Sequence, residues 1–124
     1  MTTMSLIAAS DAVATALQRA GAHPGMARAA ARALVLAEAQ GMASHGLSRV
    51  TQYAAHLRNG RVAGNAVPSV RHAKGGAVLV DAHEGLAFAA CESAVAEAIG
   101  RAREFGVALA GAMSSGTMMN ASSK

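Results

Sequence analysis

Large aromatic side chains are almost absent from this sequence of 124 residues, which contains no tryptophan, one tyrosine and two phenylalanines. Apolar residues nevertheless make up 52% of the chain, and 33 of its residues are alanines. Because alanine buries little surface, at about 25 cal/mol per Å² such a core stabilises far less than one of leucine and phenylalanine. A chain this short is therefore expected to be marginally stable alone, and to belong to a larger protein or assembly.

Cysteine and long apolar runs are scarce as well. The single cysteine, Cys91, excludes an internal disulfide and a zinc site built from cysteines. No stretch offers the roughly 20 strongly apolar residues of a membrane-spanning helix. Residues 1–11 lack the basic and apolar regions of a signal peptide. These absences predict a soluble, cytoplasmic protein with no membrane partner.

Positive charge is in excess, with a net charge of +4, but it is not concentrated anywhere. The 11 lysines and arginines are scattered, and no basic run exceeds Arg-x-Arg. Aromatic residues that could stack on bases are too few for a binding platform. We therefore expect no binding to nucleic acid. The excess charge indicates either a solvated surface or a fragment without its acidic partners.

Glycine, proline and capping residues divide the first half of the chain into three expected helices. Ser10 is the predicted N-cap of the first helix, which should end at Gly21. A second, long helix is expected over residues 24–40, with proline at its first position. A third helix is expected over residues 47–59.

The pattern changes after residue 66. A Gly-Gly pair at residues 75–76 between two β-favouring runs is typical of a hairpin. A helix is predicted over residues 86–104, followed by a short buried strand over residues 107–111. Residues 114–124 show no periodicity and are expected to be disordered.

These elements together predict the α+β class. The chain would contain only the first strands of a mixed α/β sheet. We expect a helical region over residues 1–66 and the start of an α/β region over residues 67–112. Residues 113–124 form the predicted tail. The most distinctive polar motif lies in the first of these regions.

That motif reads S-H-G-L-S-R at residues 44–49, in the expected loop before the third helix. The imidazole of His45 can exchange a proton near neutral pH, and the Ser44 hydroxyl could orient it. Arg49 lies near the N-terminus of the third helix, where its guanidinium and the partial positive charge favour a carboxylate. Tyr53 shares that helix face, four residues later. The motif is short, so its spacing alone is also compatible with an exposed polar loop.

Residues 38–53 read E-A-Q-G-M-A-S-H-G-L-S-R-V-T-Q-Y, which resembles the signature of the malate/L-lactate dehydrogenase family of NAD(P)-dependent oxidoreductases. The resemblance continues with L-R-N-G at residues 57–60, L-V-D-A-H-E-G-L-A at residues 79–87 and A-I-G-R-A-R-E-F-G-V at residues 98–107. It covers roughly residues 10–112 in order and with matching spacing, so it is more specific than the short motif.

The resemblance implies a homodimeric enzyme with a non-Rossmann cofactor fold that interconverts 2-oxo and 2-hydroxy acids with NAD or NADP. Relatives in this family act on ureidoglycolate, sulfolactate, or cyclic imines such as Δ1-piperideine-2-carboxylate. The motif implies that His45 is the proton donor, that Ser44 belongs to its relay, and that Arg49 binds the substrate carboxylate. These roles agree with the chemistry of the three side chains.

The sequence departs from the family after residue 112. There the family continues with a His-His-Phe-Gly-like loop that contacts the nicotinamide cofactor, whereas residues 113–120 read M-S-S-G-T-M-M-N. No G-x-G-x-x-G motif replaces that loop, so the cofactor-binding residues stay unassigned. We therefore expect a truncated or frame-shifted chain that neither binds NAD(P)H tightly nor turns over substrate alone.

Other polar residues have simpler structural interpretations. Cys91 is expected to be a small packed residue, and Asp81 and Glu84 are expected at a turn and at a helix start. No metal site is predicted, because four histidines match no zinc spacing and are expected to be exposed: His23, His56, His72 and His83. The alternative to an oxidoreductase is a non-enzymatic module whose alanine-rich helices dock on a partner.

Overall fold

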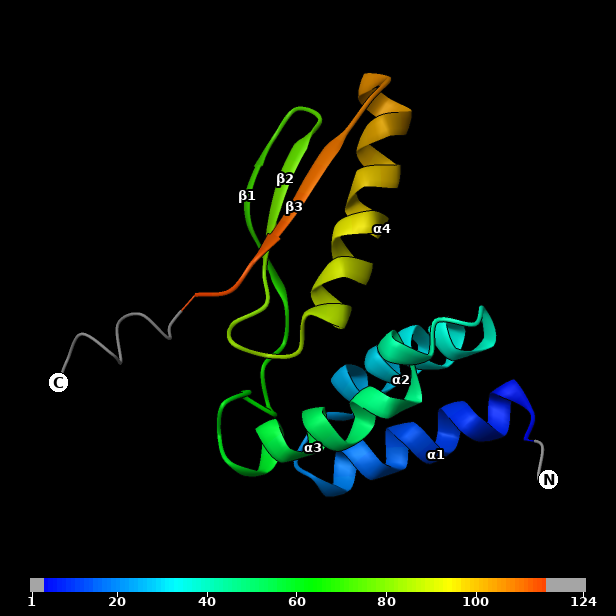
Figure 1. Ribbon diagram of the computed structural model, residues 1–124. Helices are drawn as coiled ribbons and strands as arrows, with labels where there is room; N and C mark the ends of the chain where they lie inside the picture. The colour runs from blue at the N-terminus through cyan, green and yellow to red at the C-terminus, as the bar shows by residue number, and fades with distance from the viewer. Residues whose placement is uncertain (1–3, 116–124) are drawn as a thin grey trace, which may run out of the picture. The chain divides into compact units, whose positions relative to one another are not determined.

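The computed structural model describes residues 4–115 (Figure 1). The chain divides into two compact units, residues 1–65 and residues 66–124. The described part of the first unit is helical, and that of the second unit combines strands with a helix. This mixture confirms the α+β class predicted from the sequence.

Three α-helices and two short 3-10 turns form the first unit. The helices are α1 (Leu6–Arg19), α2 (Pro24–Ala39) and α3 (Val50–Arg58), and the 3-10 turns are η1 (Ala43–His45) and η2 (Leu47–Arg49). The predicted start of the second helix at its proline is confirmed. The third predicted helix divides into η2 and α3, so its first turn is a 3-10 turn.

The first helix begins earlier than predicted. Its N-cap is Ser5, whose hydroxyl accepts a hydrogen bond from the Ala8 N–H at 3.1 Å, so the prediction of Ser10 as N-cap is wrong. Both serines are suitable caps, but the apolar residues 6–9 continue the helical pattern and allow one more turn. Asp11 therefore lies inside α1, where its carboxylate pairs with Arg28 of α2 at 2.6 Å.

Small side chains let α1 and α2 pack closely. Ala27 and Ala30 of α2 are fully buried, together with Leu17 of α1 and Leu34 of α2. Because alanine adds little area, the stability of this pair depends on close contact between the two backbones rather than on large apolar side chains. Gly21 follows α1 with φ +118°, a conformation that L-residues rarely adopt, which confirms it as the predicted stop.

A three-stranded sheet and one helix form the second unit. The strands β1 (Ser69–Lys74), β2 (Ala77–Asp81) and β3 (Leu109–Met113) lie in the order β1-β2-β3, and α4 spans Ala87–Phe105. β1 and β2 are antiparallel, which confirms the predicted hairpin, and Gly75 adopts φ +57° in its turn. β2 and β3 are parallel and are joined through α4, so they form a βαβ unit.

The core of the second unit lies between α4 and the sheet. Val78 and Val80 of β2 pack against Ala90 and Ala94 of α4. In Figure 1, α4 runs along the same side of β2 and β3. The opposite face of these strands has no helix over it within the described part of this unit.

β3 differs from the predicted strand in position and in burial. It begins at Leu109, two residues later than predicted, and the Leu109 side chain is 76% exposed. Among its residues, Ala110 packs against the core. The prediction of a buried strand is therefore wrong, because β3 lies at the edge of the sheet, with β2 on one side only in residues 4–115.

The first two residues of the predicted disordered tail are held by hydrogen bonds. The Ser114 hydroxyl accepts from the Glu84 N–H at 2.8 Å, and Ser115 donates to the Asp81 carboxylate. The prediction of disorder is therefore wrong for these two residues, and residues 116–124 lie outside the described part of the chain. No described helix is long and apolar enough to cross a membrane.

Candidate active site

The S-H-G-L-S-R motif lies in the loop that joins α2 to α3, and a carboxylate of α2 holds this loop in place. The Glu38 Oε1 atom accepts a hydrogen bond from the Leu47 N–H at 2.9 Å. Gly46 is buried against the same residue: a Cβ at this position would lie 2.6 Å from Glu38 Oε1 and 3.0 Å from Glu38 Cα. Only glycine therefore fits between the two halves of the motif.

The first half of the motif brings a hydroxyl to an imidazole. Ser44 Oγ lies 2.9 Å from His45 Nδ1, within η1. In the neutral ring, a serine that donates to Nδ1 leaves the proton on Nε2, and a serine that accepts from Nδ1 leaves Nε2 as a base. His45 is exposed, so its Nε2 atom can exchange a proton with a small molecule in either direction.

The second half of the motif fixes a guanidinium beside the same serine. Arg49, the residue before α3, donates from Nε to the Ser44 carbonyl oxygen at 2.8 Å and from Nη1 to Gln52 Oε1 at 2.9 Å. These contacts use two of its five N–H donors and set the plane of the group. Ser44 therefore contacts both partners, His45 through its hydroxyl and Arg49 through its carbonyl.

Three supporting residues of this loop were not among the residues predicted from the sequence. They are Glu38 and Gln52, described above, and Ser48, whose hydroxyl donates to the Ala43 carbonyl oxygen at 2.8 Å. Glu38 lies nine residues before its partner Leu47, so spacing gives no signal for this contact. Gln52 lies one helical turn after Arg49, and helical periodicity could have indicated it.

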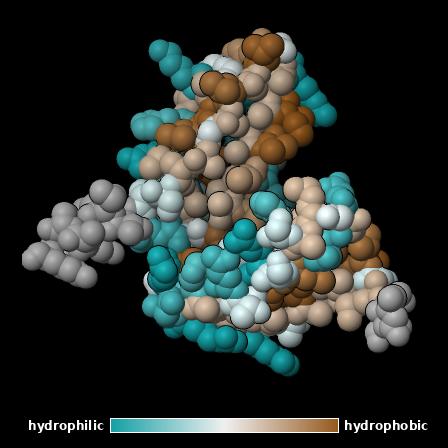
Figure 2. All heavy atoms as spheres, viewed as in Figure 1, coloured by the Kyte–Doolittle hydropathy of each residue, from teal (hydrophilic) through white to brown (hydrophobic). Residues whose placement is uncertain are grey.

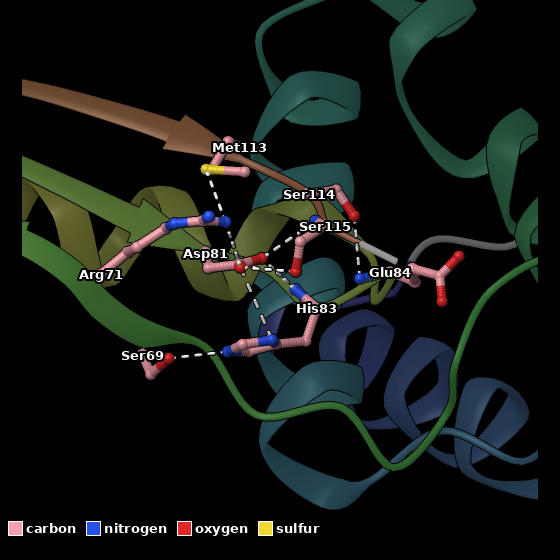
Figure 3. Close-up of polar contacts among 8 residues, drawn as sticks. All are labelled: Ser69, Arg71, Asp81, His83, Glu84, Met113, Ser114 and Ser115. Atoms are coloured by element: carbon pink, nitrogen blue, oxygen red, sulfur yellow. Dashed lines mark hydrogen bonds and ion pairs between the residues drawn. The ribbon is translucent and has the colours of Figure 1, made fainter. Parts of the chain in front are cut away.

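A second polar cluster lies at the carboxyl ends of β2 and β3 (Figure 3). The buried Asp81 carboxylate accepts from Ser115 Oγ at 2.6 Å, from the Ser115 N–H at 3.1 Å and from the His83 N–H at 2.8 Å. The Ser115 hydroxyl, and then the His83 N–H, lower the pKa of Asp81 to about 2, although burial opposes them. Asp81 is thus the last residue of β2, directly before the turn at which it was predicted, and it is the centre of a network.

Side chains from β1 complete this cluster. Arg71 Nη1 and His83 Nδ1 each lie 3.6 Å from Asp81 Oδ2, and Ser69 Oγ lies 2.7 Å from His83 Nε2. Figure 3 shows these groups around the carboxylate, with Met113 beside Arg71. The cluster therefore joins β1, the β2–α4 turn and the segment after β3 within the second unit.

The residues of the β2–α4 turn do not fit a dinucleotide pyrophosphate. In a βαβ unit this group is bound by a glycine-rich turn at the N-terminus of the helix. Here the turn carries the ionised Asp81 and also Glu84, and both His83 and Glu84 adopt positive φ values of 52° and 65°. Carboxylates at this place repel phosphate, so we derive no step through a cofactor held there.

The predictions for metal ligands and for the single cysteine can be compared with the structure. Within residues 4–115 no group of three or more His, Cys, Asp or Glu side chains could hold a metal ion. Cys91 is exposed, so the prediction of a packed cysteine is wrong. It lies on the side of α4 that borders β3.

Sequence comparison agrees with the motif and its surroundings. A sequence profile described as malate/L-lactate dehydrogenase matches residues 4–123, which is nearly the whole chain. The chain belongs to the malate/L-lactate dehydrogenase family. The match extends beyond residue 112, where the motif comparison placed the end of the resemblance.

Two members of the malate/L-lactate dehydrogenase family are similar in sequence. The (2R)-3-sulfolactate dehydrogenase (NADP(+)) of Chromohalobacter salexigens is 43% identical over 84% of this chain and 31% of its own length. The Δ1-pyrroline-2-carboxylate reductase of Ancylobacter novellus is 38% identical over 74% of this chain and 27% of its own length. The chain thus spans about a third of the length of these relatives.

A solved structure of the family has the same fold. The Δ1-piperideine-2-carboxylate reductase from Pseudomonas syringae pvar. tomato superposes with a TM-score of 0.84 and 32% sequence identity. The superposition covers 90% of this chain and 34% of the reductase. The elements described above are therefore those of a family member, over about a third of that enzyme.

Proposed function

We propose that this chain supplies the acid–base and carboxylate-binding part of an NAD(P)H-dependent oxidoreductase. The reaction is reduction of a 2-oxo acid to a 2-hydroxy acid, or of a cyclic imino acid to an amino acid. Support comes from the relatives, one named for sulfolactate and NADP(+) and another for pyrroline-2-carboxylate. Both named substrates carry a carboxylate beside the carbon that is oxidised or reduced.

The Ser44–His45 contact is the observation that carries the proposal. In its protonated form His45 donates from Nδ1 to Ser44 Oγ, and its exposed Nε2 gives a proton to the carbonyl oxygen or imine nitrogen of the substrate as the adjacent carbon is reduced. The ring is left neutral with its remaining proton on Nδ1, and in the reverse direction the same Nε2 atom takes the proton back. Ser44 thus accepts from Nδ1 in both states and keeps Nε2 turned to the substrate.

Arg49 has the role of orienting the substrate. Its guanidinium is held through Nε and Nη1, so its remaining donors present a fixed fork to the substrate carboxylate. Because Arg49 and His45 both contact Ser44, the acid end of the substrate and the group to be protonated would be bound by one short loop. Such fixed placement lowers the entropic barrier of the reaction.

A chimera tests this proposal. The part of the Chromohalobacter salexigens enzyme that matches this chain is replaced by the corresponding residues of this chain, and oxidation of NADPH is followed with the 2-oxo acid of sulfolactate. We expect reduction by the chimera, and a loss of roughly 100-fold or more in kcat with His45→Ala, which is typical of a lost general acid.

His56→Ala is the matched control, since this histidine lies on α3 outside the motif and its loss should leave kcat unchanged. Equal rates for the His45→Ala and parent chimeras would refute the proposed role. For the 124-residue chain alone we predict neither turnover nor tight NADPH binding, and isothermal titration calorimetry checks the second point. A dissociation constant in the low micromolar range would contradict it.

The oligomeric state and the cellular location of the protein are predictions. A homodimer is implied by the resemblance to the family, and a cytoplasmic location is predicted from the composition. Light scattering and fractionation of the cells that make the protein would check them. The non-enzymatic alternative predicts that the chimera is folded and inactive while the chain still captures a partner through its helices.

A further inference from the structure

The polar cluster at the carboxyl ends of β2 and β3 contains a hydroxyl, an imidazole and a carboxylate that contact one another in that order (Figure 3). Ser69 Oγ lies 2.7 Å from His83 Nε2, and His83 Nδ1 lies 3.6 Å from Asp81 Oδ2. A hydroxyl within hydrogen-bond distance of an imidazole, with a third group on the other ring nitrogen, is the general arrangement of an activated nucleophile. The function proposed above uses none of these three residues.

The charge of Asp81 decides which ring nitrogen of His83 carries the proton. The carboxylate is buried, and the Ser115 hydroxyl, followed by the His83 N–H, lowers its pKa to about 2, so it is ionised and can only accept. An acceptor beside Nδ1 favours the neutral ring with its proton on Nδ1, which leaves Nε2 unprotonated. The contact of 2.7 Å is then a hydrogen bond that the Ser69 hydroxyl donates to Nε2, as general base catalysis requires.

The backbone at His83 holds the ring beside this carboxylate. The His83 N–H donates to Asp81 Oδ1 at 2.8 Å, while the ring faces Oδ2 of the same group. His83 adopts φ 52°, in the left-handed region that residues other than glycine seldom occupy. Backbone strain of this kind is common at functional sites. Here it accompanies the turn that brings the imidazole to Ser69, 14 positions earlier in the chain.

Water and small molecules can reach the cluster. Ser69 and His83 are both exposed. Figure 2 shows hydrophobic residues gathered over α4 and β3, with hydrophilic residues at the margins, and the cluster lies at such a margin, where the strands end. Arg71, 3.6 Å from Asp81 Oδ2, adds a positive charge to the cluster, and positive charge favours the oxyanion that forms in acyl transfer.

We propose that Ser69 is a nucleophile for acyl transfer, with activated esters of small carboxylic acids as its substrates. Such esters need no cavity for their acyl group, which suits a site on the surface. Ser69 Oγ attacks the carbonyl carbon and passes its proton to His83 Nε2. The bond to the leaving phenol or alcohol oxygen then breaks, and that oxygen takes the proton from Nε2.

Water completes the reaction. It attacks the acyl-serine with His83 again as the base, so the carboxylic acid is released and the Ser69 hydroxyl is restored. No oxidant, reductant or cofactor takes part. This hydrolysis is therefore separate from the reduction proposed above, for which the 124-residue chain alone is predicted to be inactive.

A purely structural role is the alternative, since the hydrogen bond between Ser69 and His83 also ties β1 to the β2–α4 turn. The two roles differ in reactivity. An activated serine attacks the phosphorus of an alkyl fluorophosphonate, forms a P–O bond and expels fluoride, while its proton goes to the base. A serine that only ties two segments together remains a weak nucleophile and is not labelled.

Labelling of the 124-residue chain tests the proposal. The chain is incubated with an alkyl fluorophosphonate, and mass spectrometry of its peptides locates the adduct. We expect the adduct on Ser69, and faster hydrolysis of p-nitrophenyl acetate by the parent chain than by Ser69→Ala. His83→Asn should slow the labelling by roughly 100-fold or more, the range for a lost general base. Asparagine is among the residues that accept a positive φ, so this variant should keep the turn.

His72→Asn is the matched control, since His72 is an exposed residue of β1 that is not part of the cluster, and its loss should leave the labelling unchanged. Hydrolysis is measured in a Cys91→Ala background, because an exposed thiol also reacts with p-nitrophenyl acetate. Circular dichroism checks the fold of each variant. Ser69 is exposed, so Ser69→Ala should stay folded and decides the question if His83→Asn does not.

Three results overturn the proposal. The first is a parent chain without an adduct on Ser69. The second is a folded His83→Asn variant that is labelled as fast as the parent chain. The third is hydrolysis of p-nitrophenyl acetate that Ser69→Ala does not slow. None of these bears on the His45→Ala chimera, so the two proposals fail separately.

Discussion

Gly46 lies so close to Glu38 that a Cβ atom at position 46 would stand 2.6 Å from Glu38 Oε1. The same carboxylate oxygen accepts the hydrogen bond of the Leu47 N–H. Gly46 is thus required for packing, and the loop with Ser44 and His45 is held against α2 by a charged hydrogen bond.

Gly46→Ala should therefore destabilise the chain by about 1–3 kcal/mol, the usual range for an atom forced into a packed site. The loop must move away from Glu38, so the Leu47 contact should also weaken. Urea denaturation followed by circular dichroism measures the change. Gly100→Ala is the control: position 100 lies within α4 with open space around its Cβ, so this variant should be more stable by about 0.5–1 kcal/mol. Equal effects of the two variants would contradict the packing argument.

Ser44→Ala tests how the imidazole is oriented. Without the hydroxyl, His45 Nδ1 loses its partner at 2.9 Å, and the ring can rotate and change tautomer. In the chimera we expect kcat to fall by roughly 10-fold or more, within the range for impaired acid–base catalysis, with a smaller change in KM. Nitrogen NMR of the ring reports the tautomer directly, and a ring with unchanged nitrogen shifts in Ser44→Ala would show that the hydroxyl does not set it.

The sequence predicted this loop and most helix limits, because both depend on local patterns. Pro24, Gly21 and the hairpin glycines act on the backbone where they stand, and each appears in the structure where it was expected. The Ser5 cap was missed because a second serine offered the same local signal. The Asp81–Ser115 bond joins residues 34 positions apart, and no local pattern reports such a contact. The burial of β3 was predicted wrongly because burial depends on what lies beside the strand.

Asp81 makes the second unit sensitive to acid. Its pKa is lowered to about 2, against about 3.9 in an unfolded chain, so the ionised carboxylate stabilises the fold at pH values above its unfolded pKa. This stabilisation should be lost as the pH falls from about 4 to about 2. Ser115→Ala removes the hydroxyl that lowers the pKa of Asp81 most, so the free energy of unfolding should depend less on pH between about 4 and about 2. Urea denaturation at a series of pH values measures this dependence. If it is the same in Ser115→Ala and in the parent chain, the Ser115 hydroxyl does not lower the pKa of Asp81.

Arg49→Lys should act on substrate binding more than on proton transfer. Lysine is a single flexible point charge, so it cannot keep the contacts of Nε with Ser44 and of Nη1 with Gln52 while also binding both oxygens of a carboxylate. In the chimera we expect KM for the 2-oxo acid to rise by roughly 10-fold or more, with a smaller fall in kcat. Gln52→Ala removes one support and keeps the guanidinium, so its effect on KM should have the same direction and be smaller. If KM is unchanged in Arg49→Lys, the carboxylate is bound elsewhere, and the position of Arg49 beside Ser44 serves the structure of the loop alone.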